Sequence, residues 1–333
     1  MRKFWGFVLV LLLTLSLAAC GGNKAADSPA DSSKKIVLRV GTTTAPDGHY
    51  VKGLQQFKEK VEAYSNNKVE VNIFHSSQLG NERDMIEGVA AGTLEMTLIS
   101  SAPLTNFSSD FMLFDLPFII TDRNKAYQVM DGDVGKQLFA TLEPKGIKGL
   151  GFWENGFRNV TNNKKPIVHP ADVKGLKIRT MENPVHLETF KQLGAMPTPM
   201  AWGEVFTALQ QGTIDGQENP LAIIDSAKVY EAQKHVSLTG HFYSPAVFLM
   251  NKNLFDGFPK DVQEAILKAE KEARDWERNY SAELDVTLAK TLQEKGVTVT
   301  EVDKAEWQKA CEPVWAKFQD KIKPEYIKAL AEK

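Results

Sequence analysis

Residues 174–220 combine an arginine, an aromatic residue and several amides in an order that suits the binding of a small anion. Arg179 ends a strand-like run, Trp202 stands where a helix should begin, and amides occupy the polar corner 215–220. A guanidinium group holds a carboxylate through two parallel hydrogen bonds, and it stays charged where burial can deprotonate a lysine. The residues alone leave alternatives open: a surface ion pair, core packing and a simple turn.

A second group of polar residues lies in the first 101 positions. Residues 42–44 follow one predicted strand, Ser100 and Ser101 end another, and Glu82 begins a helix. In open α/β sheets, ligands bind outside the carboxyl ends of the strands. These residues therefore form one candidate rim. A turn, a cap or a solvated loop is the alternative for each of them.

The elements that would position this rim alternate between strand and helix. Residues 36–41 predict a buried strand, 49–64 an amphipathic helix and 68–74 a second strand. This order implies parallel pairing through a right-handed crossover. The other elements predicted before residue 155 are a helix ending at Gly92, a strand at 94–101, an apolar core segment at 111–120, a helical stretch at 123–142 and a strand at 149–154.

The following residues extend the same pattern and add one long helix. Residues 261–294 contain neither Gly nor Pro and read as one helix, which would span about 50 Å and could run along two lobes. The remaining predictions are a strand at 176–179, an amphipathic helix, a Pro-rich turn at 197–199, a helix ending at Gly212, the polar corner, a helix at 223–232, a strand at 247–250 and a tail at 297–333 with a short strand and further helix.

Length and charge restrict the class of protein. A chain of 333 residues suits two lobes better than one small core. It carries 40 Lys and Arg against 42 Asp and Glu, a net charge of −2. Because there is no basic excess, we expect no nucleic-acid partner.

The N-terminus has the pattern of an export signal. Arg2 and Lys3 precede an apolar run at 4–17, which ends in small residues and Cys20. This resembles a bacterial lipobox, so residues 1–20 are predicted to be a lipoprotein signal peptide with lipid on Cys20. An ordinary secretory signal is the alternative. Residues 21–35 read as a flexible tether. The other cysteine, Cys311, would then have no disulfide partner.

Motifs for catalysis and for metal binding are missing. The sequence has no nucleophile elbow, no His-Glu-x-x-His, no phosphate loop and no dinucleotide fingerprint. Its six histidines lack metal-ligand spacing. We therefore expect no catalytic residues, metal or cofactor, and a binding protein rather than an enzyme. A secreted hydrolase is the enzymatic alternative.

Several motifs together resemble the solute-binding proteins of tripartite ATP-independent periplasmic (TRAP) transporters, the DctP family. The resemblance covers most of residues 36–333. The motifs that carry it are Ser76-Ser77-Gln78-Leu79-Gly80, Leu116-Pro117-Phe118, Gly156-Phe157-Arg158, Gly175-Leu176-Lys177-Ile178-Arg179, Pro197-Thr198-Pro199-Met200-Ala201 and Asp215-Gly216-Gln217-Glu218-Asn219-Pro220.

The resemblance implies an α/β, two-lobed fold like that of periplasmic binding proteins. A ligand cleft would lie between the lobes, and a long helix would span both. We expect residues 36–155 with 245–284 to form the first lobe and residues 156–244 with 285–333 to form the second. Hinge closure on an organic acid would be the working motion.

The resemblance also assigns ligand-binding roles to single residues. Arg179 matches the arginine that grips a carboxylate. The other matching positions are Arg158, Asn219, Trp202, Thr43, His49, Glu82 and Ser100. Trp202 departs from the family, which usually has Phe there. Some sialic-acid-binding relatives carry an acid at the position of Ser100, which argues against that substrate.

The expected function is that of a monomeric, extracytoplasmic, lipid-anchored receptor that delivers a small organic-acid anion to TRAP permease subunits. A role as ligand-sensing partner of a membrane sensor is an alternative. C4-dicarboxylates, sugar acids such as uronates, and aromatic or branched 2-oxo acids all remain open as ligands. Glu82 or His49 facing the cleft would favour a hydroxyl-rich sugar acid, and an apolar wall at Trp202 would favour a less polar acid.

Overall fold

Nine strands form one sheet within residues 35–331, the part of the chain that the computed structural model describes. Their order is β2-β1-β3-β8-β4-β7-β5-β6, with β9 beside β8. The strands are β1 (Ile36–Gly41), β2 (Val69–Phe74), β3 (Met96–Ser100), β4 (Ile147–Asn162), β5 (Lys177–Thr180), β6 (Met196–Pro199), β7 (Gly216–Asn219), β8 (His235–Asn251) and β9 (Thr298–Thr300).

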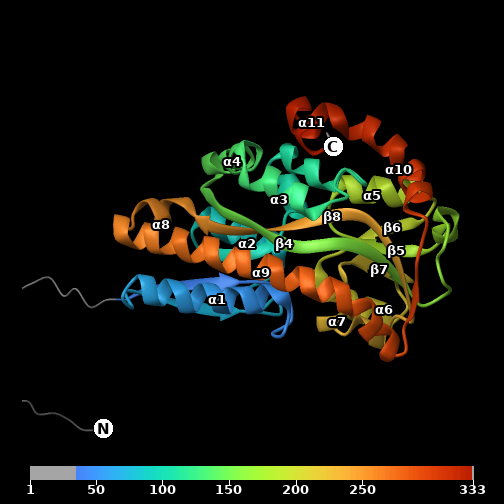
Figure 1. The fold of residues 1–333 in the computed structure, drawn as a ribbon, viewed down its shortest axis with the longest axis horizontal. Coiled ribbons are helices and arrows are strands. Elements are labelled where there is room, and N and C mark those ends of the chain that lie inside the picture. Colours follow the sequence, from blue (N-terminus) through green and yellow to red (C-terminus); the bar gives the residue numbers. More distant parts are fainter. Residues whose placement is uncertain (1–34, 332–333) are drawn as a thin grey trace, which may run out of the picture. The chain divides into compact units, whose positions relative to one another are not determined.

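Eleven α-helices accompany the sheet within these residues (Figure 1). They are α1 (His49–Tyr64), α2 (Glu82–Ala91), α3 (Arg123–Asp131), α4 (Asp133–Ala140), α5 (Pro184–Gln192), α6 (Trp202–Gln210), α7 (Leu221–Ser226), α8 (Lys252–Asp256), α9 (Lys260–Glu294), α10 (Lys304–Phe318) and α11 (Pro324–Ala331). Cys20 and residues 21–34 of the predicted tether lie outside the described residues. Within residues 35–331, no helix is both long enough and apolar enough to cross a membrane.

The first α/β half follows the sequence closely. β1 pairs in parallel with both β2 and β3, as the strand–helix–strand order predicts. Helix α1 buries the expected apolar stripe of Tyr50, Leu54, Phe57 and Val61. The helical stretch predicted at 123–142 is divided between α3 and α4.

The central strands β4 and β8 are much longer than predicted. They form an antiparallel pair from Ile147–Asn162 and His235–Asn251, and they connect the two halves of the sheet. The full length of β4 could not be predicted, because strand prediction relies on apolar runs and β4 contains several buried polar side chains. Register shifts interrupt the pair, one of them between Glu154 and Gly156, where the backbone of Gly156 has φ of +121°.

The second half replaces two predicted turns with strands. The Pro-rich segment 196–199 is β6, an edge strand beside β5, where a missing proline N–H costs no ladder hydrogen bond. The polar corner includes β7, which pairs with the distal half of β4. Its side chains are polar and nevertheless buried, because they find polar partners.

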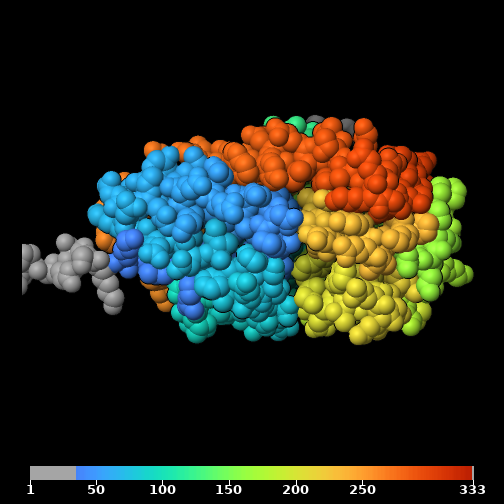
Figure 2. Space-filling model, turned by 90° about the horizontal axis from the view of Figure 1, so that it is seen from below, coloured from blue at the N-terminus to red at the C-terminus, as the bar shows by residue number. Residues whose placement is uncertain are grey.

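Helix α9 connects the cores of the two halves. Its first turns carry Ile266 and Ala273 into a core with α1, and its last turns carry Leu288 and Leu292 into a core with α6 and α7. Figure 2 shows the blue and cyan residues adjoining the yellow residues, with the orange segment that contains α9 extending over both. The predicted long helix is therefore confirmed, with Lys260 as its first residue and Glu294 as its last.

A buried acid of α9 packs directly on β4. Glu270 is 3% exposed and accepts a hydrogen bond of 3.0 Å from Nε1 of Trp153. Gly151 lies so close to this carboxylate that a Cβ there would overlap it. Burial raises the pKa of Glu270 to about 7, although Arg274 and Arg278 act in the opposite direction.

This raised pKa predicts a pH-dependent stability. Folded Glu270 keeps its proton up to a pKa of about 7, whereas the unfolded side chain releases it near 4.5. The contribution of this group to stability is therefore fully present below pH 4.5. The free energy of unfolding then falls by about 3 kcal/mol as pH rises from 4.5 to 7. Glu270→Gln should lack this loss, so urea unfolding at pH 5 and pH 8 should separate the two proteins. Parallel pH curves would contradict the prediction.

Candidate functional site

A cavity lies at the carboxyl ends of several strands, and its space free of atoms is about 330 Å³ when the open solvent at its mouth is included. The loop after β1, the last residues of β3 and β7, and the end of β5 contribute to its wall, as the strand-end rule predicts. The lining residues are Thr43, Thr44, Tyr50, Glu82, Ser100, Asn155, Arg179, Met181, Trp202, Asn219 and Ile223.

Arg179 projects from β5 and is only 3% exposed. Its Nε and Nη2 donate to the carbonyl oxygen of Met200 at 2.9 and 2.6 Å. Its guanidinium carbon lies 5.7 Å from the ring centroid of Trp202. Nη1 has no hydrogen-bond partner among residues 35–331. One N–H on each terminal nitrogen therefore remains for an end-on pair of hydrogen bonds.

Arg179 keeps its charge in this buried position. Burial and the neighbouring Arg158 lower the pKa of Arg179 to about 10. That value is still well above neutral pH. The cavity wall therefore carries a positive charge that its immediate hydrogen bonds, all to a carbonyl oxygen, do not neutralise.

Arg158, the second predicted arginine, is fully buried on β4 and does not line the cavity. Its Nε lies 2.5 Å from Oε2 of Glu218, and its Nη2 donates to Oε1 of Glu218 at 2.8 Å. His241 Nε2 lies 3.3 Å from the same carboxylate. Burial would raise the pKa of Glu218, but Arg158 and His241 hold it well below its usual range.

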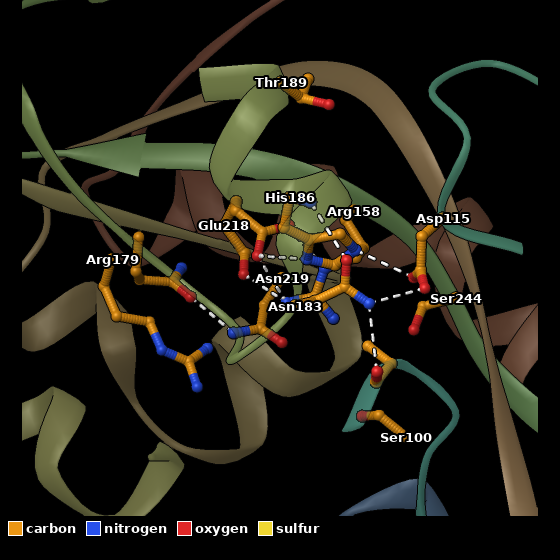
Figure 3. A network of polar contacts seen from close by, with 12 residues as sticks. Ser100, Asp115, Arg158, Arg179, Asn183, His186, Thr189, Glu218, Asn219 and Ser244 are labelled. Carbon is orange, nitrogen blue, oxygen red and sulfur yellow. Dashed lines mark hydrogen bonds and ion pairs between the residues drawn. The ribbon is translucent and has the colours of Figure 1, made fainter. Parts of the chain in front are cut away.

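A polar network continues from Glu218 toward the 3₁₀ segment Ser109–Asp115 (Figure 3). His186 Nδ1 lies 4.0 Å from Oε1 of Glu218, and His186 Nε2 lies 3.0 Å from Oδ1 of Asp115. Asn183, at the start of α5, donates to Oδ2 of Asp115 at 2.7 Å. One feature of the sequence indicates this network: Asp115 is the only charged residue in the apolar segment 111–120.

His49 is placed differently from the predicted ligand residues around it. It is buried, does not line the cavity, and packs edge-on against Tyr50 with ring centroids 4.6 Å apart. Burial lowers the pKa of His49 to about 4, so the ring is neutral at pH 7. Tyr50, one helical position later, faces the cavity instead.

The wall opposite Arg179's strand is rich in acceptors. Glu82 is partly buried, and its Oε1 accepts a hydrogen bond of 2.8 Å from the backbone N–H of Ser100. Burial raises the pKa of Glu82, against the lowering effect of the hydrogen bond from Ser100 and of the positive charge of Arg179. Asn155 Nδ2 donates to Oγ of Ser100 at 3.3 Å, and its Oδ1 has no partner among the described residues.

The structure thus brings most of the predicted ligand residues together around one cavity: Thr43, Glu82, Ser100, Arg179, Trp202 and Asn219. Thr44, from the predicted rim at 42–44, also lines it. Sequence reasoning did not single out the remaining lining residues as ligand contacts, which are Tyr50, Asn155, Met181 and Ile223. Elsewhere in residues 35–331, no group of three or more His, Cys, Asp or Glu side chains is arranged to hold a metal ion.

Comparison with known proteins shows similarity along most of the chain. The model of the family "Bacterial extracellular solute-binding protein, family 7" (DctP) matches residues 40–321. A solute-binding protein of Verminephrobacter eiseniae is 43% identical over 291 residues, which is 87% of each chain. The 2,3-diketo-L-gulonate-binding periplasmic protein of Escherichia coli is 39% identical over 268 residues, covering 80% of this chain and 82% of that protein.

A solved structure extends the similarity to the fold. A TRAP periplasmic solute-binding protein of Polaromonas, bound to D-erythronate, superposes with a TM-score of 0.87 at 40% identity. The superposition covers 89% of this chain and 98% of that one. Such relatives are two-lobed α/β proteins of transport systems and not enzymes. The chain therefore belongs to the DctP family of bacterial extracellular solute-binding proteins, the receptors of TRAP transporters.

Proposed function

We propose that this receptor binds a small organic-acid anion in the described cavity and that Arg179 holds its carboxylate. The observation that carries the proposal is a buried, charged guanidinium with an end-on pair of N–H groups that residues 35–331 leave unpaired. A buried charge is unfavourable unless it is paired. A carboxylate supplies the missing charge and accepts both hydrogen bonds at once.

The neighbouring residues support an anion in this place. Arg158 is not part of the wall, and we propose that it contributes a fixed positive charge behind it, largely balanced by Glu218. Asn219 Nδ2 donates to Oε1 of Gln217 at 2.5 Å, so its second N–H, which has no partner among the described residues, can donate to the ligand. Trp202 would cover the bound acid and exclude water from the hydrogen bonds of Arg179.

The ligands of the relatives agree with an acid. One relative is named for 2,3-diketo-L-gulonate, and the Polaromonas structure contains D-erythronate. Both compounds are carboxylates. We therefore place this chain among receptors for small organic acids, with sugar acids and C4-dicarboxylates as the two classes to be separated.

The two proposed lobes, residues 36–155 with 245–284 and residues 156–244 with 285–333, would close on this acid. Contacts between them are present: Asn183 donates to the carbonyl oxygen of Ala102 at 3.0 Å as well as to Asp115. Helix α11 also contacts α3, so the tail reaches back to the first lobe. A ligand held by both lobes would favour the closed state, which the permease could then recognise.

We further propose that the receptor is monomeric and works outside the cytoplasm, tethered by lipid on Cys20. The small residues before Cys20 and the polar segment 21–35 support this arrangement. The acid would be handed to the membrane subunits of the transporter. Globomycin, which blocks the signal peptidase for lipoproteins, should cause the precursor to accumulate, and unchanged processing would contradict the lipid anchor.

Trp202 provides a direct test of binding in this cavity. A bound acid should change the tryptophan emission of the wild-type protein, because the indole borders the cavity and lies over Arg179. Trp202→Phe should lose most of that change while still binding in calorimetry. An emission change that persists in Trp202→Phe would place the ligand elsewhere.

A further inference from the structure

We infer that the ligand is a hydroxylated monocarboxylate rather than a C4-dicarboxylate, and that Glu82 and Asn155 accept hydrogen bonds from its hydroxyl groups. This inference rests on the proposed function, because it takes Arg179 as the site of the carboxylate. It concerns the opposite wall of the same cavity. That wall is built from α1, α2, β3 and β4.

The first observation is an excess of hydrogen-bond acceptors on this wall. Glu82 carries two acceptor oxygens, and one of them accepts a hydrogen bond from the backbone N–H of Ser100. Asn155 is 3% exposed, and its Oδ1 is buried without a partner in the described chain. The hydroxyl of Tyr50 is likewise buried and unpaired there. These three groups all belong to residues that line the cavity.

Unpaired acceptors determine what a ligand must offer. Buried polar atoms are almost always hydrogen-bonded, and leaving one unsatisfied weakens binding by about tenfold or more. A hydroxyl group can donate to Glu82 or Asn155 and can also accept from Tyr50. An ionised dicarboxylate can accept hydrogen bonds but cannot donate them. It would therefore leave the acceptor oxygens of Glu82 and Asn155 without a donor.

The second observation is the balance of charge. Arg179 is the positive side chain among the lining residues, and Glu82 is the negative one. Arg158 lies behind the wall and is already paired with Glu218. One ligand carboxylate can pair with Arg179, but a second would find no other cation among the lining residues and would approach the carboxylate of Glu82. Two neighbouring carboxylates repel each other more strongly in a protein interior than in water.

The pKa of Glu82 supports this picture. Burial already raises it, although Ser100 and Arg179 act in the opposite direction. A second ligand carboxylate nearby would raise the pKa further and would force Glu82 to take up a proton. A hydroxyl donating to Glu82 has the opposite effect and stabilises its charged form.

The remaining wall determines which part of the ligand can be apolar. Met181, Trp202 and Ile223 offer apolar surface that suits the C–H groups of a short carbon chain. The cavity is polar on one side and apolar on the other. This suits a ligand carbon chain whose hydroxyl groups face α2 and β4.

The test compares three acids with the same number of carbon atoms. D-erythronate carries one carboxylate and several hydroxyls, succinate carries two carboxylates, and butyrate carries one carboxylate alone. Calorimetry of the wild-type protein should give D-erythronate an affinity at least about 100-fold above those of succinate and butyrate. Equal or tighter binding of succinate would overturn the inference.

Glu82→Gln removes the negative charge and replaces one acceptor oxygen with an NH2 donor, while it keeps the size of the side chain. The variant should bind D-erythronate about 10- to 100-fold more weakly, while its affinity for succinate should stay the same or rise. Equal weakening of both acids would overturn the inference. Glu87→Gln is the matched control, because Glu87 is an exposed glutamate on the same helix, paired with Arg83, and should change neither affinity.

Asn155→Leu provides a second variant in case Glu82→Gln unfolds. It removes the unpaired Oδ1 at similar size, together with the hydrogen bonds that Nδ2 donates to Ser100 and Ser244. It should therefore weaken D-erythronate selectively and should improve binding of butyrate relative to wild type. The two hypotheses fail in different ways. If acids bind through Arg179 but succinate is preferred, only this inference is wrong. If Arg179→Ala leaves the affinity of every acid unchanged, the proposed function is wrong.

Discussion

Replacing Arg179 with alanine should weaken binding of the acid by at least about 100-fold. The variant removes both proposed end-on hydrogen bonds and leaves the ligand's carboxylate without its positively charged partner. Hydrogen bonds to charged groups contribute about 1.5–3 kcal/mol each, and truncating one partner of a buried charged pair costs about 2–5 kcal/mol. Isothermal titration calorimetry with the preferred acid measures the loss directly.

Two further variants make this result specific. Arg179→Lys keeps a positive charge but cannot form the paired, planar contact, so it should lose most of the affinity as well. Arg83→Ala removes an exposed arginine that pairs with Glu87 on α2, and it should bind like the wild type. Near wild-type affinity in both Arg179 variants would contradict the carboxylate clamp.

Replacing Glu218 with alanine should lower the free energy of unfolding by about 3–5 kcal/mol, because it leaves Arg158 buried without its counter-charge. Three hydrogen bonds of Arg158, at 2.5 to 2.8 Å, go to the side chain and backbone of Glu218. His241 would lose its carboxylate partner at the same time. Urea unfolding monitored by circular dichroism measures the change.

The depressed pKa of Glu218 gives this contribution a definite pH dependence. A carboxylate whose folded pKa lies below the unfolded value of 4.5 stabilises the fold above that value, and the stabilisation is lost as pH falls. The wild-type protein should therefore approach the Glu218→Ala variant in stability under strongly acidic conditions. A double variant, Arg158→Met with Glu218→Leu, should be more stable than Glu218→Ala alone. Equal stability of Glu218→Ala and wild type at pH 7 would refute the account of this pair.

The sequence predicts the parts of the fold in which apolar periodicity is strong. β1, α1 and β2 and the long helix α9 agree with prediction to within a residue. Prediction found only residues 149–154 of β4 and 247–250 of β8, and it missed β6 and β7, because polar side chains or prolines interrupt the apolar pattern. Their stability depends on partners such as Glu218 for Arg158, which lie far away in the sequence and cannot be recognised from local composition.

The candidate site shows the same limit. Arg179, Trp202 and Asn219 could be proposed because residue type and family motifs both indicate them. Tyr50 could not be separated from His49, because the rotation of α1 decides which of two adjacent residues faces the cavity. Asn155 lies in the unpredicted distal part of β4, so nothing in the sequence linked it to a ligand.

The substrate question raised by the sequence can now be stated in terms of chemistry. Glu82 and Trp202 both line the cavity, whereas His49 does not. The cavity therefore combines an acidic, acceptor-rich wall with an apolar one. A hydroxylated carbon chain with one carboxylate satisfies both walls and leaves Arg179 paired.

The central claim is that this cavity binds a small organic-acid anion through its carboxylate. A thermal-shift measurement tests it most directly, with D-erythronate, D-galactonate and succinate each compared with the neutral alcohol of the same carbon skeleton. A ligand at 100 times its Kd stabilises the folded state by about 2.7 kcal/mol. We predict a midpoint raised by several degrees for at least one acid and unchanged for its neutral counterpart. Equal shifts with acid and alcohol, or no shift with any acid, would contradict the claim.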